Sequence, residues 1–321
     1  MSDSNGRRYR LVTRSDFDGL VCAALLRHIG LVDDIKFVHP KDMQDGKVEI
    51  SDSDITTNLP YVEGVHLAFD HHPSEKLRIQ GTPDNWVMDA GALSTARVVF
   101  DHFGGAQRFP QFGEEIMTAV DNADAARFSE EEILEPTGWT LLSFLMDPRT
   151  GLGRFREFRI SNYQLMMELI DACTRLTIAE IFELPDVKER VELYTEHESQ
   201  AIEQIRRCST AHDKVVVLDL RDEEVIHPTN RFMVYALYPE SNISIHVIWG
   251  LKKQNTVLAT GKSIVDRSSP TDVGKLMLSY GGGGHKAAGT CQIDNDRVDN
   301  VLGEVIARIH ADETQAHGVP A

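Results

Sequence analysis

Short apolar runs separated by polar residues and by stretches with helical spacing dominate the first half of the chain. Apolar runs of four or five residues bounded by turn residues predict strands. The strands predicted on this basis are 9–13, 35–39, 65–69 and 86–89. Strands that alternate with helices are typical of an α/β fold, whose mostly parallel sheet presents its ligands at the carboxyl ends of the strands.

Helical spacing then takes over. We predict helices at 20–29, 93–103 and 113–126, and a largely helical region at 130–184. Residues 186–208 contain neither glycine nor proline, which predicts a long helix between domains. A second strand-rich region follows, with strands predicted at 214–220, 243–249 and 256–260, helices at 230–237 and 273–279, and a loose tail at 313–321. The pattern therefore predicts two α/β domains, 1–185 and 211–321, joined by a helical linker at 186–210.

Composition narrows the class of protein. The 321 residues, 41% of them hydrophobic, are enough to bury the cores of two domains. The formal net charge of −17 argues against a protein that holds long nucleic acid on a basic surface. The four cysteines form no CxxC pair, and no apolar run reaches the roughly 18–20 residues that a membrane span needs. We expect a cytoplasmic protein without a membrane partner.

Two acidic motifs follow predicted strands. Asp16 and Asp18 lie in Ser15-Asp16-Phe17-Asp18-Gly19, and Asp70-His71-His72 follows the run 65–69. Carboxylates with histidine and no cysteine suit Mn²⁺ or Mg²⁺ better than structural zinc. Aspartate is also favoured at helix N-caps, so capping is the alternative for the first pair. Because both motifs stand at strand ends, we expect them to face one cleft.

The third unusual motif is the glycine run 281–284, followed by His285. Glycine costs backbone entropy and contributes no side chain, so the run predicts close approach of a ligand or of another backbone. In order and approximate spacing, the three motifs resemble the DHH–DHHA1 phosphoesterases, which include RecJ-like exonucleases, nanoRNases and cyclic-dinucleotide phosphodiesterases. This resemblance covers nearly the whole chain. It implies an N-terminal DHH-type domain with a parallel sheet flanked by helices, and a smaller DHHA1-type substrate-binding domain.

The resemblance also implies roles for individual residues. Asp16 and Asp18 would each bind one of two Mn²⁺ or Mg²⁺ ions and His71 would bind the second, while His72 would contact the scissile phosphate and Asp70 would orient the histidines. A further metal-binding aspartate is expected to be Asp124, with Asp121 as the second choice.

Other matches imply contacts with substrate. Ser94 and Thr95 match a hydroxyl pair near the site, for which a simple helix cap is the alternative. In the second domain the resemblance implies that Gly282, Gly283 and Gly284 present backbone N–H groups to the substrate and that His285 binds it. Arg267 resembles a substrate-binding arginine, and Arg231 and Lys262 are weaker candidates.

The chain departs from the family pattern at two positions. Arg14 replaces a histidine that many relatives have two residues before the first aspartate, and Asn58 takes the place of a metal-bridging aspartate. A neutral amide binds a hard cation less well than a carboxylate does. Three outcomes stay open: Asp52 or Asp54 substitutes for the missing carboxylate, the protein works with one well-held ion, or catalysis is lost while ligand binding remains.

These features together predict a metal-dependent phosphodiesterase that hydrolyses very short oligoribonucleotides or linear dinucleotides such as pGpG, held between the domains, to mononucleotides. Attack by an activated water on phosphorus is the expected mechanism. The alternatives are an exopolyphosphatase or pyrophosphatase, which would not need the distal glycine motif, and a nucleotide-binding sensor without turnover. Both a monomer and a homodimer are compatible with the sequence.

Overall fold

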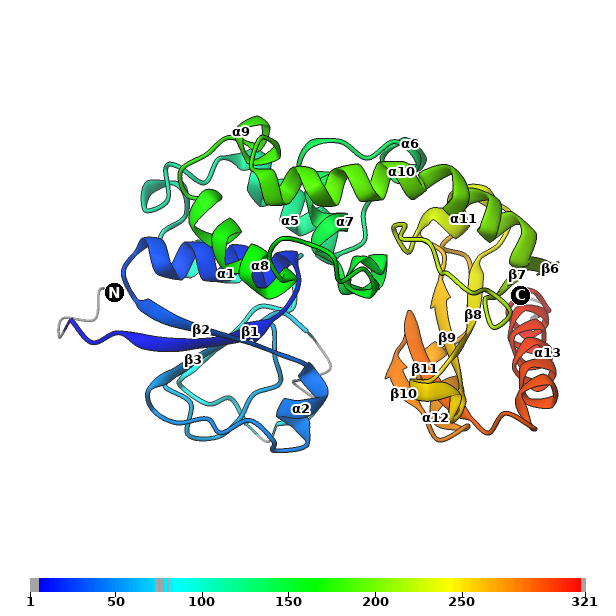
Figure 1. The fold of residues 1–321 in the computed structure, drawn as a ribbon. Coiled ribbons are helices and arrows are strands. Elements are labelled where there is room, and N and C mark those ends of the chain that lie inside the picture. Colours follow the sequence, from blue (N-terminus) through cyan, green and yellow to red (C-terminus); the bar gives the residue numbers. More distant parts are fainter. Residues whose placement is uncertain (1–5, 73–74, 76–77, 80, 319–321) are drawn as a thin grey trace. The chain divides into compact units, whose positions relative to one another are not determined.

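The chain forms two compact units. The computed structural model describes residues 6–72, 75, 78–79 and 81–318 (Figure 1). Unit 1 comprises Met1–Phe128 and Pro136–Thr195, and unit 2 comprises Ser129–Glu135 and Glu196–Ala321. The division falls inside the long helix α10 (Pro185–Cys208), so this helix contributes to both units. Helix α6 (Glu130–Leu134), which lies within the sequence range expected for the first domain, belongs to unit 2.

Unit 1 contains a five-stranded sheet in the order β2-β1-β3-β4-β5, and every strand pair in it is parallel. The strands are β1 (Tyr9–Arg14), β2 (Val32–Val38), β3 (Asp54–Thr57), β4 (Leu67–Asp70) and β5 (Trp86–Met88). The predicted parallel α/β fold is therefore confirmed. Strand β3 was not among the apolar runs, because only Ile55 among its four residues is a large apolar residue.

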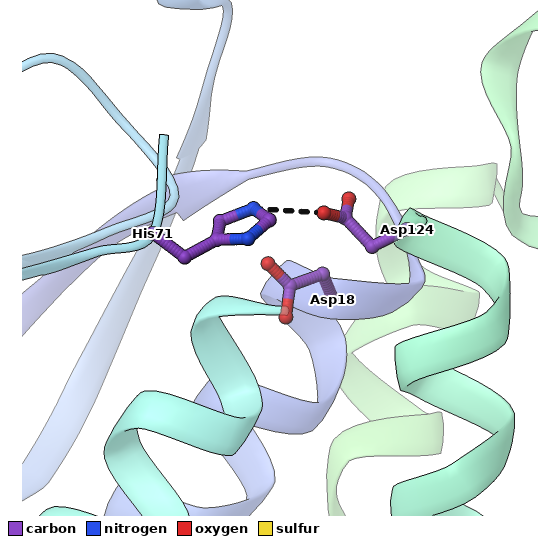
Figure 2. Close-up of side chains that lie close together, drawn as sticks. All are labelled: Asp18, His71 and Asp124. Carbon is purple, nitrogen blue, oxygen red and sulfur yellow. Dashed lines mark ion pairs between the residues drawn. The ribbon is translucent and has the colours of Figure 1, made fainter. Parts of the chain in front are cut away.

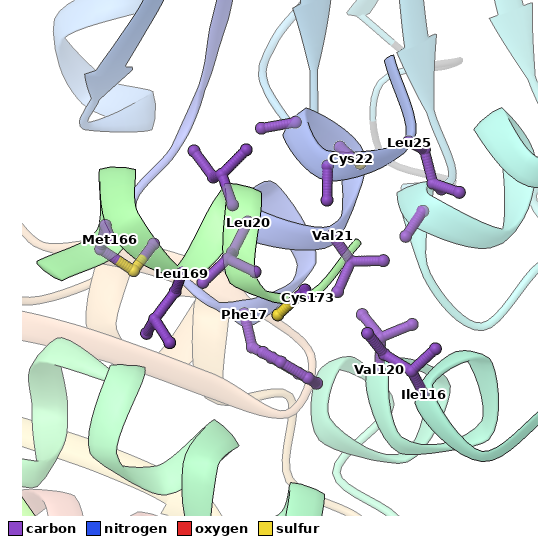
Figure 3. Packing of buried hydrophobic residues seen from close by; sticks show 14 of the residues in the cluster. Phe17, Leu20, Val21, Cys22, Leu25, Ile116, Val120, Met166, Leu169 and Cys173 are labelled. Carbon is purple, nitrogen blue, oxygen red and sulfur yellow. The ribbon is translucent and has the colours of Figure 1, made fainter. Parts of the chain in front are cut away.

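Helices surround this sheet. They are α1 (Phe17–His28), α2 (Pro40–Gln44), α4 (Thr95–His102), α5 (Glu114–Asp124), α7 (Gly138–Met146), α8 (Asn162–Ala172) and α9 (Ile178–Phe182), with 3₁₀ turns η1 (Gly105–Gln107), η2 (Pro148–Thr150) and η3 (Leu152–Arg154). In α1, every residue from Phe17 to Leu26 is buried. A helix that is buried on all sides is a core helix. Figure 3 shows its side chains packed against those of α5 and α8.

The two faces of the sheet carry separate cores, as the alternation of side chains along a strand requires. Leu11 of β1 belongs to the large core around α1, whereas its neighbour Val12 packs with Met43 of α2 and with Leu59. The sheet is thus held from both sides, which fixes the positions of its carboxyl ends.

Unit 2 contains a six-stranded mixed sheet in the order β10-β11-β9-β8-β7-β6, in which only β7 and β8 pair in parallel. Its strands are β6 (Ser209–His212), β7 (Val215–Asp219), β8 (Ile243–Trp249), β9 (Thr256–Lys262), β10 (Gly283–His285) and β11 (Ala288–Ile293). Besides α6 and the end of α10, its other elements are α11 (Met233–Leu237), η4 (Leu251–Lys253), α12 (Val273–Leu278) and α13 (Val298–His317).

Helix α13 corrects the expectation of a loose tail. Val298, Val301, Val305 and Ile309 recur at helical spacing and are buried in the core of unit 2, so the helix is held to its sheet. It continues to His317, and residues 319–321 lie outside the described part of the chain. Within the described residues, no helix has the length and apolar character needed to cross a membrane.

Candidate active site

The predicted ligands meet at one edge of the parallel sheet of unit 1. Strands β1, β3 and β4 are neighbours, and their carboxyl ends are followed by Asp16, Asn58 and His71, respectively. Because parallel strands end at the same edge, residues far apart in the sequence are brought into one site.

The turn after β1 explains the first motif. Asp16 is the N-cap of α1, and its Oδ1 accepts a hydrogen bond of 3.0 Å from the backbone N–H of Gly19. A Cβ at Gly19 would lie 2.0 Å from the carbonyl oxygen of Arg14, so no other residue fits there without a shift of the backbone. The capping alternative for Asp16 and the ligand hypothesis are therefore compatible.

Asp18 is the second residue of α1 and is buried. Its carboxylate accepts hydrogen bonds from the backbone N–H groups of Thr95 (3.2 Å) and Ala96 (2.7 Å), in the first turn of α4. Burial, and then the negative charges of Asp124 and Asp16, raise its pKa to about 7. A cation placed here would favour the ionised form.

His71 and Asp124 complete a three-residue group with Asp18 (Figure 2). One candidate ligand atom of each residue lies within 4.8 Å of the others. His71 Nδ1 is 3.2 Å from the carbonyl oxygen of Ala92, and Nε2 is 2.8 Å from Asp124 Oδ2. Although burial lowers the pKa of His71, Asp124 raises it to about 9, and His71 in turn lowers the pKa of Asp124 against the effect of burial.

Asp70 holds the second histidine. It is buried, and its Oδ1 accepts hydrogen bonds from the backbone N–H groups of His71 (2.8 Å) and His72 (3.2 Å) and lies 2.8 Å from His72 Nδ1. Burial opposes protonation of His72, but the contact with Asp70 raises its pKa overall. The orienting role expected for Asp70 agrees with these contacts.

Asp121, the second choice for the metal aspartate, lies in a different environment. Its Oδ1 accepts a hydrogen bond of 2.7 Å from the Ser94 hydroxyl, and its Oδ2 accepts two from the Arg97 guanidinium, at 2.8 and 3.0 Å. Ser94 is also the N-cap of α4, with its hydroxyl accepting from the backbone N–H of Arg97. Both side chains are engaged in joining α4 to α5, which favours the capping alternative for Ser94.

The two departures from the family pattern meet on Asp16. Arg14 Nε lies 2.9 Å from Asp16 Oδ2, and Asn58 Nδ2 donates to Asp16 Oδ1 at 3.3 Å. Asn58 adopts a left-handed backbone conformation (φ 55°), which asparagine tolerates better than most residues. The side-chain oxygen of Asn58, Oδ1, is buried and has no hydrogen-bond partner among the described residues.

Neither neighbouring aspartate replaces the missing carboxylate. Asp54 begins β3, at the edge of the sheet opposite to the site, and pairs with Arg10 at 2.6 Å. Asp52 pairs with Arg7 on the surface. Substitution by Asp52 or Asp54 is therefore wrong, because the strand places both at its amino end.

The side chains at the sheet edge fit a divalent cation. If His71 Nδ1 donates to the Ala92 carbonyl, Nε2 is left with a lone pair for a metal, the usual arrangement for a ligating histidine. The close approach of Nε2 to Asp124 lacks the direction of a hydrogen bond, and Asp70 Oδ2 is buried without a hydrogen-bond partner among the described residues. Oxygen and nitrogen donors without sulfur suit Mn²⁺ or Mg²⁺.

One charged residue near these acidic side chains was not predicted from the sequence. Arg149, in η2, pairs with Asp147 at 2.7 Å. Burial opposes its charge, but Asp147, Asp16 and Asp124 raise its pKa, which places the guanidinium within electrostatic reach of the acidic group. Its sequence context, a turn after Asp147-Pro148, carries no recognisable signal.

In unit 2 the glycine run has mostly structural explanations. Gly281 follows α12 with φ 78°, the left-handed conformation that commonly ends a helix. The Gly282 N–H donates to the Met277 carbonyl (2.9 Å), and a Cβ at Gly282 would lie 2.0 Å from the Thr290 carbonyl oxygen. The sequence-based expectation that Gly282 presents its N–H to a ligand is therefore wrong.

The remaining two glycines differ from each other. Gly284 has φ 153°, and a Cβ there would lie 2.3 Å from the Ala288 carbonyl oxygen. A Cβ at Gly283 would meet no atom within 4 Å, and Gly283 has no positive φ. Both residues lie in β10, the edge strand of the sheet. Gly283 is thus the member of the run that neither packing nor backbone conformation requires.

The other expected substrate residues of unit 2 lie on several elements. His285 ends β10, and its Nδ1 accepts from the Ala287 N–H at 3.2 Å. Lys262, at the end of β9, donates to the Ser269 carbonyl, and burial followed by the charge of Lys286 lowers its pKa. Arg267 Nε donates to the Ile264 carbonyl, and Arg231 stacks on the Phe232 ring.

Comparisons with known proteins place this geometry in a family. The chain is 59% identical to the pGpG-specific phosphodiesterase PggH from Vibrio cholerae, with a TM-score of 0.84 over 95% of this chain and 100% of that one. Two more distant structures share the fold. The first is the DHH domain of a member of a family of ribosomal proteins, with 12% identity and a TM-score of 0.55, over 94% of this chain and 86% of that one.

The second is RecJ from Thermus thermophilus in complex with Mn²⁺, with 15% identity and a TM-score of 0.52, over 95% of this chain and 52% of that one. No protein-family model and no curated protein sequence matches the chain. The similarity to PggH over the whole length is nevertheless decisive, and the order of the strand-end motifs agrees with it. The chain belongs to the DHH family of phosphoesterases, enzymes that hydrolyse phosphoester bonds.

Proposed function

We propose that this protein is a metal-dependent phosphodiesterase that hydrolyses pGpG to two molecules of GMP. The observation that carries the proposal is the 59% identity, over nearly the full length of both chains, to a phosphodiesterase described as specific for pGpG. The acidic net charge of −17 agrees with a short substrate rather than a long strand.

The ligands that we assign to the ion are Asp18, His71 and Asp124, with Mn²⁺ or Mg²⁺ as the ion. When bound, such an ion would act as a Lewis acid that withdraws charge from the phosphate and would lower the pKa of a water molecule bound to it. Helix α4 fixes Asp18 through two backbone hydrogen bonds, and the Ala92 carbonyl fixes the ring of His71. The protein therefore holds its ligands in place before the ion arrives.

We assign His72 to the scissile phosphate. Because Nδ1 is held by Asp70, Nε2 is the ring nitrogen that remains to contact a ligand. The His72 side chain is 40% exposed, so a ligand can reach it. The raised pKa of His72 favours the protonated ring, whose Nε2–H can donate to a phosphate oxygen as negative charge develops in the transition state. In unit 2, the candidates for binding the remote end of the dinucleotide are Gly283, His285, Lys262 and Lys286.

The test is a GMP-release assay with the full-length protein on pGpG, other linear diribonucleotides, longer oligoribonucleotides, a cyclic dinucleotide and polyphosphate. Each substrate is assayed with Mn²⁺, Mg²⁺ and chelator. We expect hydrolysis of pGpG that requires the metal and disappears in Asp124→Asn. Release of phosphate from polyphosphate alone would indicate the exopolyphosphatase alternative, and tight binding of pGpG without GMP release would indicate a sensor.

A further inference from the structure

Asp16 is the acidic residue of the site that forms an ion pair with an arginine. It is not part of the group formed by Asp18, His71 and Asp124. Its Oδ2 pairs with Arg14, and its Oδ1 accepts from the Gly19 N–H and from the Asn58 amide. A carboxylate offers about four lone-pair positions, and three donors are already directed at this one.

Charge leads to the same conclusion. Two guanidinium groups, those of Arg14 and Arg149, act on Asp16, and Asp18 and Asp124 carry the two negative charges that balance one divalent ion. A second divalent ion at Asp16 would lie beside the positively charged Arg14 guanidinium. Repulsion between the two cations would weaken its binding, most strongly in a site with limited access to water.

Asn58 adds a second obstacle. Its amide N–H donates to Asp16, so a cation that bound between these residues would face a hydrogen-bond donor. If the amide were turned over to offer its carbonyl oxygen, the contact with Asp16 would become a repulsion between two acceptors. The amide orientation and the Arg14 ion pair therefore support each other around one carboxylate.

We infer that the protein binds a single divalent ion, at Asp18, His71 and Asp124, and that the Arg14 guanidinium takes the place of a second ion beside Asp16. This inference rests on the proposed function for the presence of an ion, but concerns the number of ions rather than the substrate. Arg14 is partly exposed, at 34% of its side-chain surface, and is anchored at the end of β1. A fixed planar guanidinium in this position suits two oxygens of a phosphate group.

The test counts ions without measuring turnover. Mn²⁺ is titrated into the full-length, chelator-treated protein, and bound ions are followed by electron paramagnetic resonance, which distinguishes one isolated Mn²⁺ from a coupled pair. We expect one isolated Mn²⁺ per chain in the wild type. In Arg14→His combined with Asn58→Asp, we expect a second ion and the signal of a coupled pair.

Arg27→Ala is the matched control, because Arg27 lies on α1 and pairs with Asp171 instead, at 3.1 Å. It should bind one ion, as the wild type does. Two coupled ions in the wild type would overturn the inference, and so would a folded double variant that still binds one. If the double variant does not fold, Arg14→His alone replaces it. Failure to hydrolyse pGpG would contradict the proposed function but leave the ion count unchanged.

Discussion

The backbone N–H of Ala96, in the first turn of α4, donates a hydrogen bond of 2.7 Å to Asp18 Oδ1. This bond connects the amino ends of two helices at the edge of the sheet. It orients the carboxylate but does not compensate for its burial, because the pKa of Asp18 is still raised to about 7. The fold therefore buries a carboxylate whose ionised form costs free energy unless a cation lies beside it.

Asp18→Asn should separate metal binding from folding. An asparagine oxygen can still accept from Ala96, although its NH2 group then faces the Thr95 N–H, and the repulsion from Asp16 and Asp124 disappears, which offsets that loss. We expect the variant to unfold in chelator at the wild-type temperature or above it. Saturating Mn²⁺ should stabilise the wild type by about 2.7 kcal/mol at about one hundred times its Kd, but leave the variant unchanged. Calorimetry with and without Mn²⁺ measures both effects, and an equal stabilisation of the variant would contradict the assignment of Asp18.

Asp124→Asn and Asp121→Asn form a matched pair on helix α5. Asp124 lies beside His71, whereas Asp121 binds Ser94 and Arg97. We expect Asp124→Asn to lower Mn²⁺ affinity by at least about 100-fold with little loss of stability. Asp121→Asn should lower the free energy of unfolding by about 1–3 kcal/mol, because Arg97 loses the nearer of its two charged partners, and should retain Mn²⁺ affinity. The reverse pattern in titration calorimetry and urea unfolding would mean that the second-choice aspartate is the ligand.

The strand-end motifs could be expected at one sheet edge from the sequence, because parallel strands convert sequence order into spatial proximity. Asp16, Asp18 and His71 follow strands, so a correct sheet places them together. The choice between Asp121 and Asp124 depended on which face of α5 meets the sheet edge, and this comes from packing rather than from the motif. Arg149 went undetected because the turn that carries it reaches the acidic group only through the tertiary fold.

For the glycine run 281–284, the sequence indicated a special backbone but not the reason for each glycine. Four adjacent glycines indicate close backbone approach, and the structure divides that signal between a helix end at Gly281, close packing on β11 at Gly282 and Gly284, and an open position at Gly283. The sequence could not distinguish these causes, because each depends on atoms of another element. Strands β10 and β11 were likewise not predicted, because neither contains an apolar run of four or five residues.

Gly283→Ala and Gly282→Ala test whether a ligand approaches this strand. The Gly283 variant meets no atom of the protein, so its melting temperature should stay within about 2 °C of the wild type, while KM for pGpG should rise about tenfold with kcat little changed. Gly282→Ala forces a methyl group against the Thr290 carbonyl and should cost about 1–3 kcal/mol or more. Steady-state kinetics with thermal melts compares the two. An unchanged KM in Gly283→Ala would remove this position from the substrate site.

His246 should make the protein sensitive to acid independently of the active site. Ile245 and Val247 of β8 face the core of unit 2, so the His246 side chain lies on the other face of the sheet, where burial lowers its pKa to about 4. The unfolded chain takes up this proton near pH 6.5 and the folded chain does so only near pH 4. The stabilising effect of a neutral His246 is thus complete above about pH 6.5 and is lost as pH falls toward 4.

Since the His246 side chain is only half-buried, we expect a loss of about 1–3 kcal/mol. Urea unfolding of wild type and His246→Gln at about pH 7.5 and about pH 4.5, on either side of most of this titration, measures it. The wild type should lose more stability than the variant between the two pH values, because glutamine takes up no proton. Equal losses would show that the ring is hydrated in the folded protein.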